Sequence, residues 1–228
     1  MELSIDTSTR YASVGISIEG KIVREYSWLS KQNHSVELLP SIESLLSTYG
    51  MVVRDIDCVV VAIGPGGFSA LRVGLSTAKA LAVAVNVPII GLNTLDIEAY
   101  PFNDVRMPVC SLMDMGRGEM AAALYSAEQG CWTKIQNEQI MAPDDLCSSI
   151  KDPTLFSGEG VAYFASILME HLGKNAVLAD QSLPTRSPAT LADMGYQRFQ
   201  KGEHDDVYSL EPLYLRRPSI TTRRQHIL

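Results

Sequence analysis

The stretch Cys58-Val-Val-Val-Ala-Ile63 runs directly into the turn Gly64-Pro65-Gly66-Gly67 and decides the fold. A short, uniformly apolar run that ends at a glycine turn is typical of a parallel strand buried on both faces of its sheet. In the following segment, residues 69–85, a small residue recurs at every fourth position, which predicts a helix with one smooth side. Strand, turn and helix in this order indicate an α/β protein.

The glycine turn has two interpretations. The first N–H groups of a helix are unpaired and lie at the positive end of its dipole, so a glycine-rich turn at this point suits a phosphate group. The spacing, however, fits neither Gly-x-Gly-x-x-Gly nor the Walker pattern, and Pro65 removes one N–H. Gly64, Pro65, Gly66 and Gly67 are therefore predicted to form a structural turn that allows close packing.

Outward from this stretch, the chain shows one order of elements twice. Each half begins with a strand ending in an aspartate, Asp6 or Asp114, and continues with two strands, a helix, a strand, a glycine turn and a helix. The expected elements are 2–6, 11–18, 21–28, 35–49, 58–63, 69–85 and 88–92, then 107–113, 119–125, 131–141, 144–151, 154–157, 161–172, 176–179 and 188–201. This order predicts a duplicated actin-like (ASKHA, ribonuclease-H-like) fold with two lobes, 1–102 and 103–228.

Asp6-Thr7-Ser8-Thr9 follows the first predicted strand, at the end that faces the cleft between the lobes in this fold. In nucleotide-binding members of the fold, such a loop offers N–H groups and hydroxyls to phosphates, and its aspartate helps to place a metal. The same residues also suit a polar turn whose side chains bond to nearby backbone. The four residues alone leave both interpretations open.

Two predicted helices, 35–49 and 69–85, carry more apolar residues than contact with one sheet requires. We therefore expect an oligomer interface on them, with Gly64, Gly66 and Gly74 permitting close approach. The expected interface residues are Leu38, Leu39, Ile42, Leu45, Leu46, Ala70, Leu71, Gly74, Leu75 and Ala78. The alternative is packing of the small-residue stripe on the protein's own sheet.

The composition is that of a globular protein: of 228 residues, 46% are hydrophobic and 20% are charged. A net charge of −7 argues against broad coating of nucleic acid. The first residues lack the features of a secretory signal, and no apolar run approaches the ~20 residues of a membrane span. Four widely spaced cysteines suit a reducing compartment, so we expect a cytoplasmic protein.

Catalytic motifs are scarce. The histidines and cysteines lack the spacing of metal ligands, and no Gly-x-Ser-x-Gly motif is present, so neither a metal nor a cofactor is expected. Asp6, Asp114 and Glu119 are candidates to meet at the cleft, although they also suit a solvated surface. The C-terminal segment after Tyr214 carries four arginines, which indicate either a solvated tail or a contact to RNA or an acidic partner.

Four blocks of the sequence resemble the bacterial TsaB family, also called YeaZ. They are Ile5-Asp-Thr-Ser-Thr9, His34-Ser-Val-Glu-Leu-Leu-Pro40, Gly64-Pro-Gly-Gly-Phe-Ser-Ala-Leu-Arg-Val-Gly-Leu75 and Pro212-Leu-Tyr-Leu-Arg216. The resemblance covers essentially the whole chain in the right order and length. Older labels such as glycoprotease-like attach to the wider family.

The resemblance implies a non-catalytic dimerisation subunit of the machinery that makes threonylcarbamoyladenosine beside the anticodon of tRNA. It implies a catalytic partner, TsaD, which carries the metal and nucleotide site, and an ATPase, TsaE. A homodimer is implied when the chain is alone, and tRNA is reached through the complex. On this interpretation Asp6–Thr9 is a remnant phosphate loop.

Two other functions are alternatives. The first is an actin-fold ATPase or kinase that binds nucleotide at Asp6–Thr9. The second is a peptidase, which would need a nucleophile or a metal pair.

The chain departs from the family pattern in two blocks. The family usually has Gly-Pro-Gly-Ser-Phe-Thr-Gly, and here Gly67, Ser69 and Ala70 replace its Ser, its Thr and its final Gly. These changes keep small residues in place and remove the serine hydroxyl. The second block reads Asp114-Met-Gly-Arg-Gly-Glu119 in place of Asp-Ala-Arg-x-Gly-Glu, so no family role is transferred to the displaced Arg117.

Overall fold

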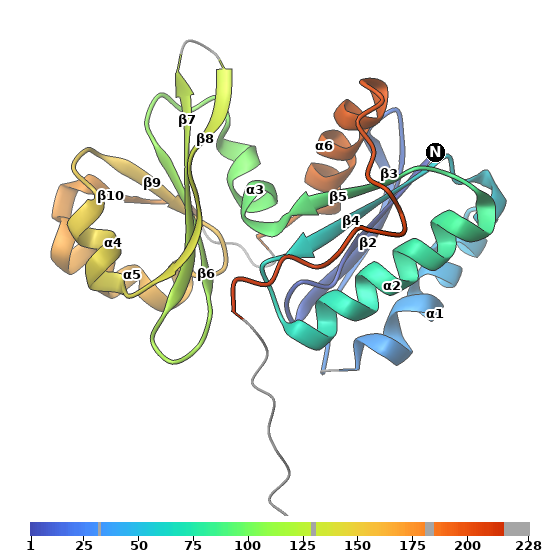
Figure 1. Cartoon of the computed structure of the whole chain (residues 1–228), viewed down its shortest axis with the longest axis horizontal. Helices are drawn as coiled ribbons and strands as arrows, with labels where there is room; N and C mark the ends of the chain where they lie inside the picture. Colours follow the sequence, from blue (N-terminus) through green and yellow to red (C-terminus); the bar gives the residue numbers. More distant parts are fainter. Residues whose placement is uncertain (32, 129–130, 181–184, 217–228) are drawn as a thin grey trace, which may run out of the picture.

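The computed structural model describes residues 1–31, 33–128, 131–180 and 185–216, which form two five-stranded mixed sheets flanked by helices (Figure 1). The first half contains β1 (Glu2–Asp6), β2 (Tyr11–Ile18), β3 (Lys21–Leu29), α1 (His34–Thr48), β4 (Cys58–Gly64), α2 (Phe68–Val85), β5 (Ile89–Asn93) and α3 (Thr94–Ala99). The second contains β6 (Val109–Asp114), β7 (Met120–Glu128), β8 (Cys131–Met141), α4 (Pro143–Ser149), β9 (Thr154–Ser157), α5 (Val161–Leu172), β10 (Ala176–Leu178) and α6 (Pro188–Gln200).

The strands of the first sheet lie in the order β3-β2-β1-β4-β5. β1 pairs antiparallel with β2 and parallel with β4, which places Leu3 beside Val59. β4 also pairs with β5 and is thus an inner strand, and its residues from Cys58 to Ala62 are buried. The apolar run quoted first is therefore the centre of the first lobe, as expected for a parallel strand covered on both faces.

The second sheet repeats this arrangement in the order β10-β9-β6-β7-β8. β6 takes the place of β1: it pairs antiparallel with β7 and parallel with β9, and it ends at Asp114 as β1 ends at Asp6. The turn at Gly158–Gly160 follows β9, as the first glycine turn follows β4. The prediction of a duplicated, two-lobed actin-like fold is confirmed.

Helices cover both faces of the first sheet. α1 and α2 pack side by side on one face, where Ile42 and Ala78 join the core of β1, β2 and β4. α6 covers the other face, with Leu191 packed among Cys58 and Val60. A sheet of apolar strands needs cover on both faces, so the chain returns to the first lobe at its end. α6 lies within the predicted second lobe, 103–228, in sequence, but it packs on the sheet of the first lobe.

α3 lies between the two sheets (Figure 1). Its Leu95 and Ala99 belong to the core of the second sheet, whereas Ile97 belongs to the core between the first sheet and α6. The helix begins at a cap, because the Asn93 side chain accepts hydrogen bonds from the backbone N–H groups of Leu95 and Asp96. One short helix is thus part of both cores.

α2 is long and apolar enough, by length and composition alone, to pass as a membrane span. Its position explains much of this character, because Leu71, Leu75, Ala78 and Ala82 are buried against the first sheet. Its outer side is also partly apolar, because Val83 is exposed there.

Candidate functional site

The loop Asp6–Thr9 is closed by its own side chains. Asp6, Thr7 and Ser8 are buried, and the N–H of Ser8 donates to Asp6 Oδ1 at 2.7 Å. The Ser8 hydroxyl donates to the same oxygen. The Thr7 hydroxyl donates to the carbonyl of Ala70 at 2.7 Å. The two bonds to Asp6 are the local bonds of a polar turn, and the Thr7 bond ties the loop to α2. Together they use the hydroxyls that a phosphate would need.

The glycine turn packs directly on this loop. The N–H of Gly67 donates to the carbonyl of Ser8 at 2.7 Å, so a donor at the start of α2 is already paired. A Cβ atom at Gly66 would collide with the same carbonyl, and one at Gly74 would collide with the Thr7 hydroxyl. The glycines thus admit the protein's own loop, which corrects the expectation that they admit a second protein.

A buried guanidinium, that of Arg186, sits where the two lobes meet. Its Nε lies 2.6 Å from Asp6 Oδ2, its Nη1 2.7 Å from Glu98 Oε1 and its Nη2 2.7 Å from Glu159 Oε1. Nη2 also donates to the Thr9 hydroxyl at 2.7 Å. Burial opposes the charge, but the three carboxylates raise the pKa of Arg186 above its ordinary value. A fixed cation therefore neutralises Asp6.

Sequence analysis missed this cluster of Asp6, Glu98, Glu159 and Arg186, which we call the Arg186 cluster. Arg186 lies between β10 and α6, Glu98 in α3, and Glu159 in the turn before α5. Glu159 lies inside the second glycine turn, Gly158-Glu159-Gly160, so the sequence alone marks its position. No motif marks Arg186, because its partners lie up to 180 positions away.

A C-terminal strap, residues 203–216, runs from α6 along α2 and covers the glycine turn (Figure 1). The N–H of Leu213 donates to the carbonyl of Ile63 at 2.8 Å. A Cβ atom at Gly64, whose φ is 114°, would lie 2.7 Å from the Leu213 carbonyl oxygen. The Tyr214 hydroxyl accepts a hydrogen bond from Arg72 Nε at 3.0 Å. The turn is therefore enclosed by the protein's own chain on its outer side.

The other candidate carboxylates do not join Asp6. Asp114 is exposed and accepts the N–H of Gly116 at 2.9 Å, and Glu119 pairs with Arg216 at the end of the strap. Among the described residues, no hydrogen bond or ion pair links either carboxylate to Asp6, which favours the alternative of a solvated surface for Asp114 and Glu119. Arg117 is exposed, and the rest of the basic tail, residues 217–228, lies outside the described residues.

Within the part of the chain that the structure describes, no group of three or more His, Cys, Asp or Glu side chains is arranged to hold a metal ion. Cys58, Cys110 and Cys147 are free and buried. Burial raises the pKa of both Cys58 and Cys110 to about 12, so their thiols are protonated near neutral pH and are weak nucleophiles. These cysteines have the surroundings of core residues.

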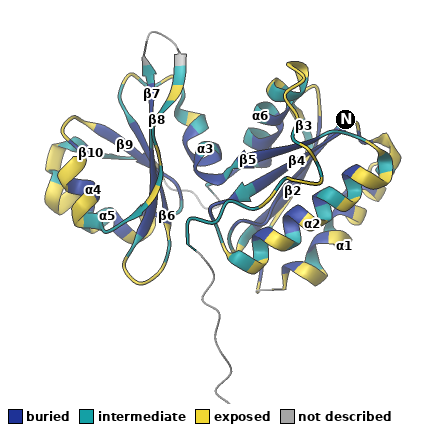
Figure 2. Cartoon of the chain, in the orientation of Figure 1, coloured by how far each residue is buried: buried dark blue, intermediate teal, exposed yellow. Residues whose placement is uncertain are grey.

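The expected interface residues of α1 and α2 mostly face inward (Figure 2). Leu39 is 55% exposed and Ala70 is half-buried. The others are buried in the protein's own core: Leu38, Ile42, Leu45, Leu46, Leu71, Gly74, Leu75 and Ala78. This corrects the residue assignment, because the helical period that gathers apolar residues into one stripe also turns that stripe toward the sheet.

The outer sides of these helices present a different set of residues, which we call the α1–α2 face. Val36 and Val83 are 68% and 51% exposed. The α1–α2 face consists of Val36, Leu39, Ser76, Ala80, Val83 and Ala84, all exposed and uncharged. Two charged residues, Glu43 and Arg72, are exposed on the same sides of these helices. Exposed apolar residues that gather on one surface are typical of an interaction site.

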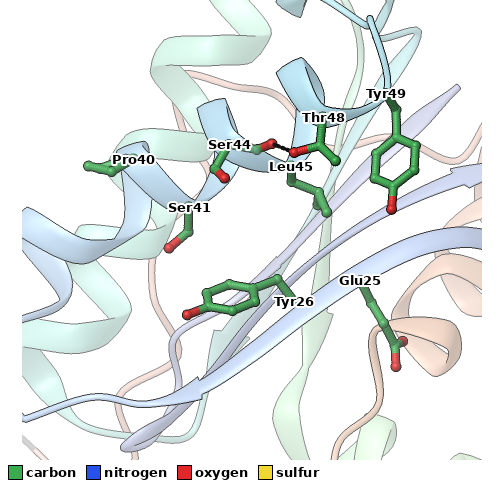
Figure 3. A pocket seen from close by; sticks show the side chains of 8 residues that line it. All are labelled: Glu25, Tyr26, Pro40, Ser41, Ser44, Leu45, Thr48 and Tyr49. Atoms are coloured by element: carbon green, nitrogen blue, oxygen red, sulfur yellow. Dashed lines mark hydrogen bonds between the residues drawn. The ribbon is translucent and has the colours of Figure 1, made fainter.

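A pocket of about 440 Å³ opens between α1 and β3 (Figure 3). Its walls are Glu25, Tyr26, Pro40, Ser41, Ser44, Leu45, Thr48 and Tyr49. Leu45 is the one predicted site residue among them. The pocket shares no residue with the Arg186 cluster, so it lies apart from the cleft.

Comparison with known proteins places the chain in a family. The family model "TsaD: tRNA N6-adenosine threonylcarbamoyltransferase" matches residues 28–222. The tRNA threonylcarbamoyladenosine biosynthesis protein TsaB of Bacillus subtilis is 29% identical, with 94% of this chain and 93% of the relative covered. TsaB of Escherichia coli is 28% identical, with 94% of each covered.

The solved structures agree with the sequences in fold. YeaZ from Pseudomonas aeruginosa superposes with a TM-score of 0.76 at 24% identity, covering 94% of this chain and 99% of that one. Its arrangement of two lobes is thus the arrangement found here. The chain belongs to the family that the threonylcarbamoyltransferase model describes and, within it, to the TsaB proteins, also called YeaZ.

Proposed function

We propose that this protein is a non-catalytic subunit required for the threonylcarbamoyladenosine modification of tRNA beside the anticodon. It acts in the cytoplasm by pairing with a catalytic TsaD-like subunit, together with a TsaE-like ATPase. The names of the TsaB relatives support the pathway. The observation that supports a non-catalytic role is the buried ion pair in which Arg186 neutralises the carboxylate of Asp6.

The Arg186 cluster leaves little for a nucleotide to bind. Phosphates at Asp6–Thr9 would need the donor of Gly67 and the hydroxyls of Thr7 and Ser8, which are already paired inside the protein. Displacing Arg186 would leave buried carboxylates without their cation, which is strongly unfavourable. The remnant loop Asp6–Thr9 therefore serves to join the lobes, and the chemistry falls to another chain.

The α1–α2 face is the surface through which we propose that pairing occurs. Its six residues are exposed, uncharged and apolar or small, so a partner helix can approach them closely. The exposed Glu43 and Arg72 on the same sides would need a partner of opposite charge. A TsaD-like subunit takes this face in the complex, and a second copy takes it when the protein is alone. tRNA is reached through the complex.

The proposal is tested by depleting the protein in its own cells and measuring tRNA nucleosides by mass spectrometry. Threonylcarbamoyladenosine is expected to fall and to return when the parent gene is supplied. A rescue gene carrying both Leu39→Glu and Val83→Glu is expected to fail, whereas Tyr163→Glu, an exposed site on α5, is expected to rescue. An unchanged nucleoside profile after depletion would refute the proposal.

A further inference from the structure

The short helix α3 turns a different side to each lobe, and five of its six residues are buried. Because positions three or four apart lie on the same side of a helix, Leu95 and Ala99 form one side. Both pack in the core of the second sheet. Thr94 and Ile97 form another side, and Ile97 packs between the first sheet and α6. Apolar packing alone therefore fixes α3 in both lobes.

Asp96 binds α3 to the second sheet. Its Oδ1 accepts a hydrogen bond from the Tyr125 hydroxyl of β7 at 2.7 Å and lies 2.7 Å from Lys134 Nζ of β8. The ammonium group also lies 3.0 Å from Glu138 Oε2. Burial opposes its charge, but Asp96 and Glu138 raise the pKa of Lys134 above its ordinary value. We call these four residues, Asp96, Tyr125, Lys134 and Glu138, the Asp96 joint.

Glu98 binds α3 to the first lobe. Its Oε1 lies 2.7 Å from Arg186 Nη1, and the same guanidinium pairs with Asp6 at the end of β1. The Thr94 hydroxyl adds a hydrogen bond to the Ser8 hydroxyl at 3.2 Å. All five of these residues are buried, so water is not at hand to replace a bond that breaks.

The residue after α3 continues this arrangement. Tyr100 begins the turn Tyr100–Phe102, and its hydroxyl donates to Asp193 Oδ2 of α6 at 3.0 Å. Gln197 Nε2, also from α6, donates to the Tyr100 hydroxyl at 2.6 Å. Every second residue from Thr94 to Tyr100 thus makes a polar contact with one of the two lobes.

These contacts oppose a hinge motion at α3. Residues of a hinge must change conformation while the bodies on either side move. Turning the second lobe about α3 would break the Asp96 joint or separate Glu98 from Arg186. Either break would leave charged groups in a poorly hydrated place without their partners, which is strongly unfavourable. The Asn93 cap also holds the start of the helix against unwinding.

We propose that α3 locks the two lobes at one angle, with the Asp96 joint holding the second lobe and Glu98 holding the first. The chain therefore does not open and close around a ligand, as many two-lobed proteins do. It presents one fixed shape to a partner. The lock is formed within one chain, so it is expected whether or not the protein pairs with a TsaD-like subunit.

The test measures the distance between the lobes by double electron–electron resonance. One spin label is attached at Val52→Cys in the first lobe and the other at Tyr163→Cys on α5, two exposed positions. Every protein also carries Cys131→Ser. Labelled protein is diluted with an excess of unlabelled protein, so that distances between copies do not contribute. The labelled parent is expected to show one narrow distance.

Two variants break the Asp96 joint. Asp96→Ala removes the acceptor, and Lys134→Met removes the charge while keeping a long side chain. Each is expected to widen the distance distribution or to add a second distance. The matched control, Asp145→Ala, removes an exposed carboxylate of α4 and is expected to keep the narrow distance of the parent.

Two results would overturn the lock. The first is a labelled parent with a broad distribution or two distances, and this measurement decides even if a variant does not fold. The second is a folded Asp96→Ala or Lys134→Met protein with the parent's single narrow distance.

Discussion

At the scale of single residues, Arg186 joins three parts of the chain: the end of β1, α3 and the turn before α5. The ion pairs form in a dry interior, so each charge depends on its partners for the solvation that water no longer supplies. The guanidinium is planar and offers donors in several directions, which a lysine cannot do from one ammonium group. This geometry explains why one side chain can bind Asp6, Glu98 and Glu159 together.

Replacing Arg186 with methionine is expected to cost about 3–5 kcal/mol in the free energy of unfolding, because buried carboxylates lose their cation. Denaturant unfolding followed by circular dichroism measures this. The matched control is Arg24→Met, an exposed arginine over the Tyr49 ring, with an expected cost of about 1 kcal/mol or less. Equal costs for the two variants would show that the Arg186 cluster does not hold the fold.

Gly74 gives a test of packing at a single position. Gly74→Val places a side chain against Thr7, and overpacking of this kind costs about 1–3 kcal/mol. Ala84→Val, on the outer side of the same helix, is expected to change stability by about 0.5 kcal/mol. Chemical denaturation of both variants makes the comparison. A Gly74→Val protein as stable as Ala84→Val would mean that α2 does not lie against the loop Asp6–Thr9 as described.

At the scale of elements, α1 and α2 each carry apolar residues on two sides, an inner side toward the first sheet and an outer side toward solvent. The inner sides bury residues such as Ile42 and Leu75 against the first sheet. The outer sides carry the exposed residues of the α1–α2 face. A helix wholly polar on its outer side would be the norm for a surface helix of a single soluble domain.

This difference predicts opposite outcomes for two kinds of substitution. Val83→Glu is expected to leave the Tm nearly unchanged and to abolish self-association and co-purification with a TsaD-like subunit, because a charge would be buried at the interface. Ile42→Glu is expected to prevent folding. Analytical ultracentrifugation and thermal unfolding separate the two. A Val83→Glu protein that still pairs as the parent does would rule out the α1–α2 face.

At the scale of the whole molecule, three connections draw the lobes together. α3 belongs to both cores, the chain returns from the second lobe to the first at α6, and Arg216 of the strap pairs with Glu119 at the start of β7. The Arg186 cluster lies among these connections. The two lobes therefore meet over charged and hydrogen-bonded groups that belong to the protein itself.

For this reason we expect no binding of Mg-ATP in calorimetric titration of the purified protein. The loop that would hold phosphates is paired internally, and the strap covers the glycine turn. The titration is to be repeated with Arg186→Met, which removes the internal cation. Micromolar binding to the parent, abolished by Asp6→Asn, would instead support the nucleotide-binding alternative.

The sequence by itself determined the elements and their order. The apolar run at β4, the strands ending in Asp6 and Asp114, and the two glycine turns were all read correctly because they depend on residues close together in the chain. The family could be identified from the same blocks, because they are continuous in sequence.

Only the tertiary structure decided which groups meet. Arg186 reaches Asp6 across 180 positions, and no periodic pattern relates them. Most of the predicted interface residues are buried in the protein's own core, since an apolar stripe does not state whether its own sheet or another protein will cover it. The sheet covers it here, because packing within one chain costs no association entropy. The glycine turn likewise admits the protein's own loop, since Ser8 lies against Gly66 in the folded chain.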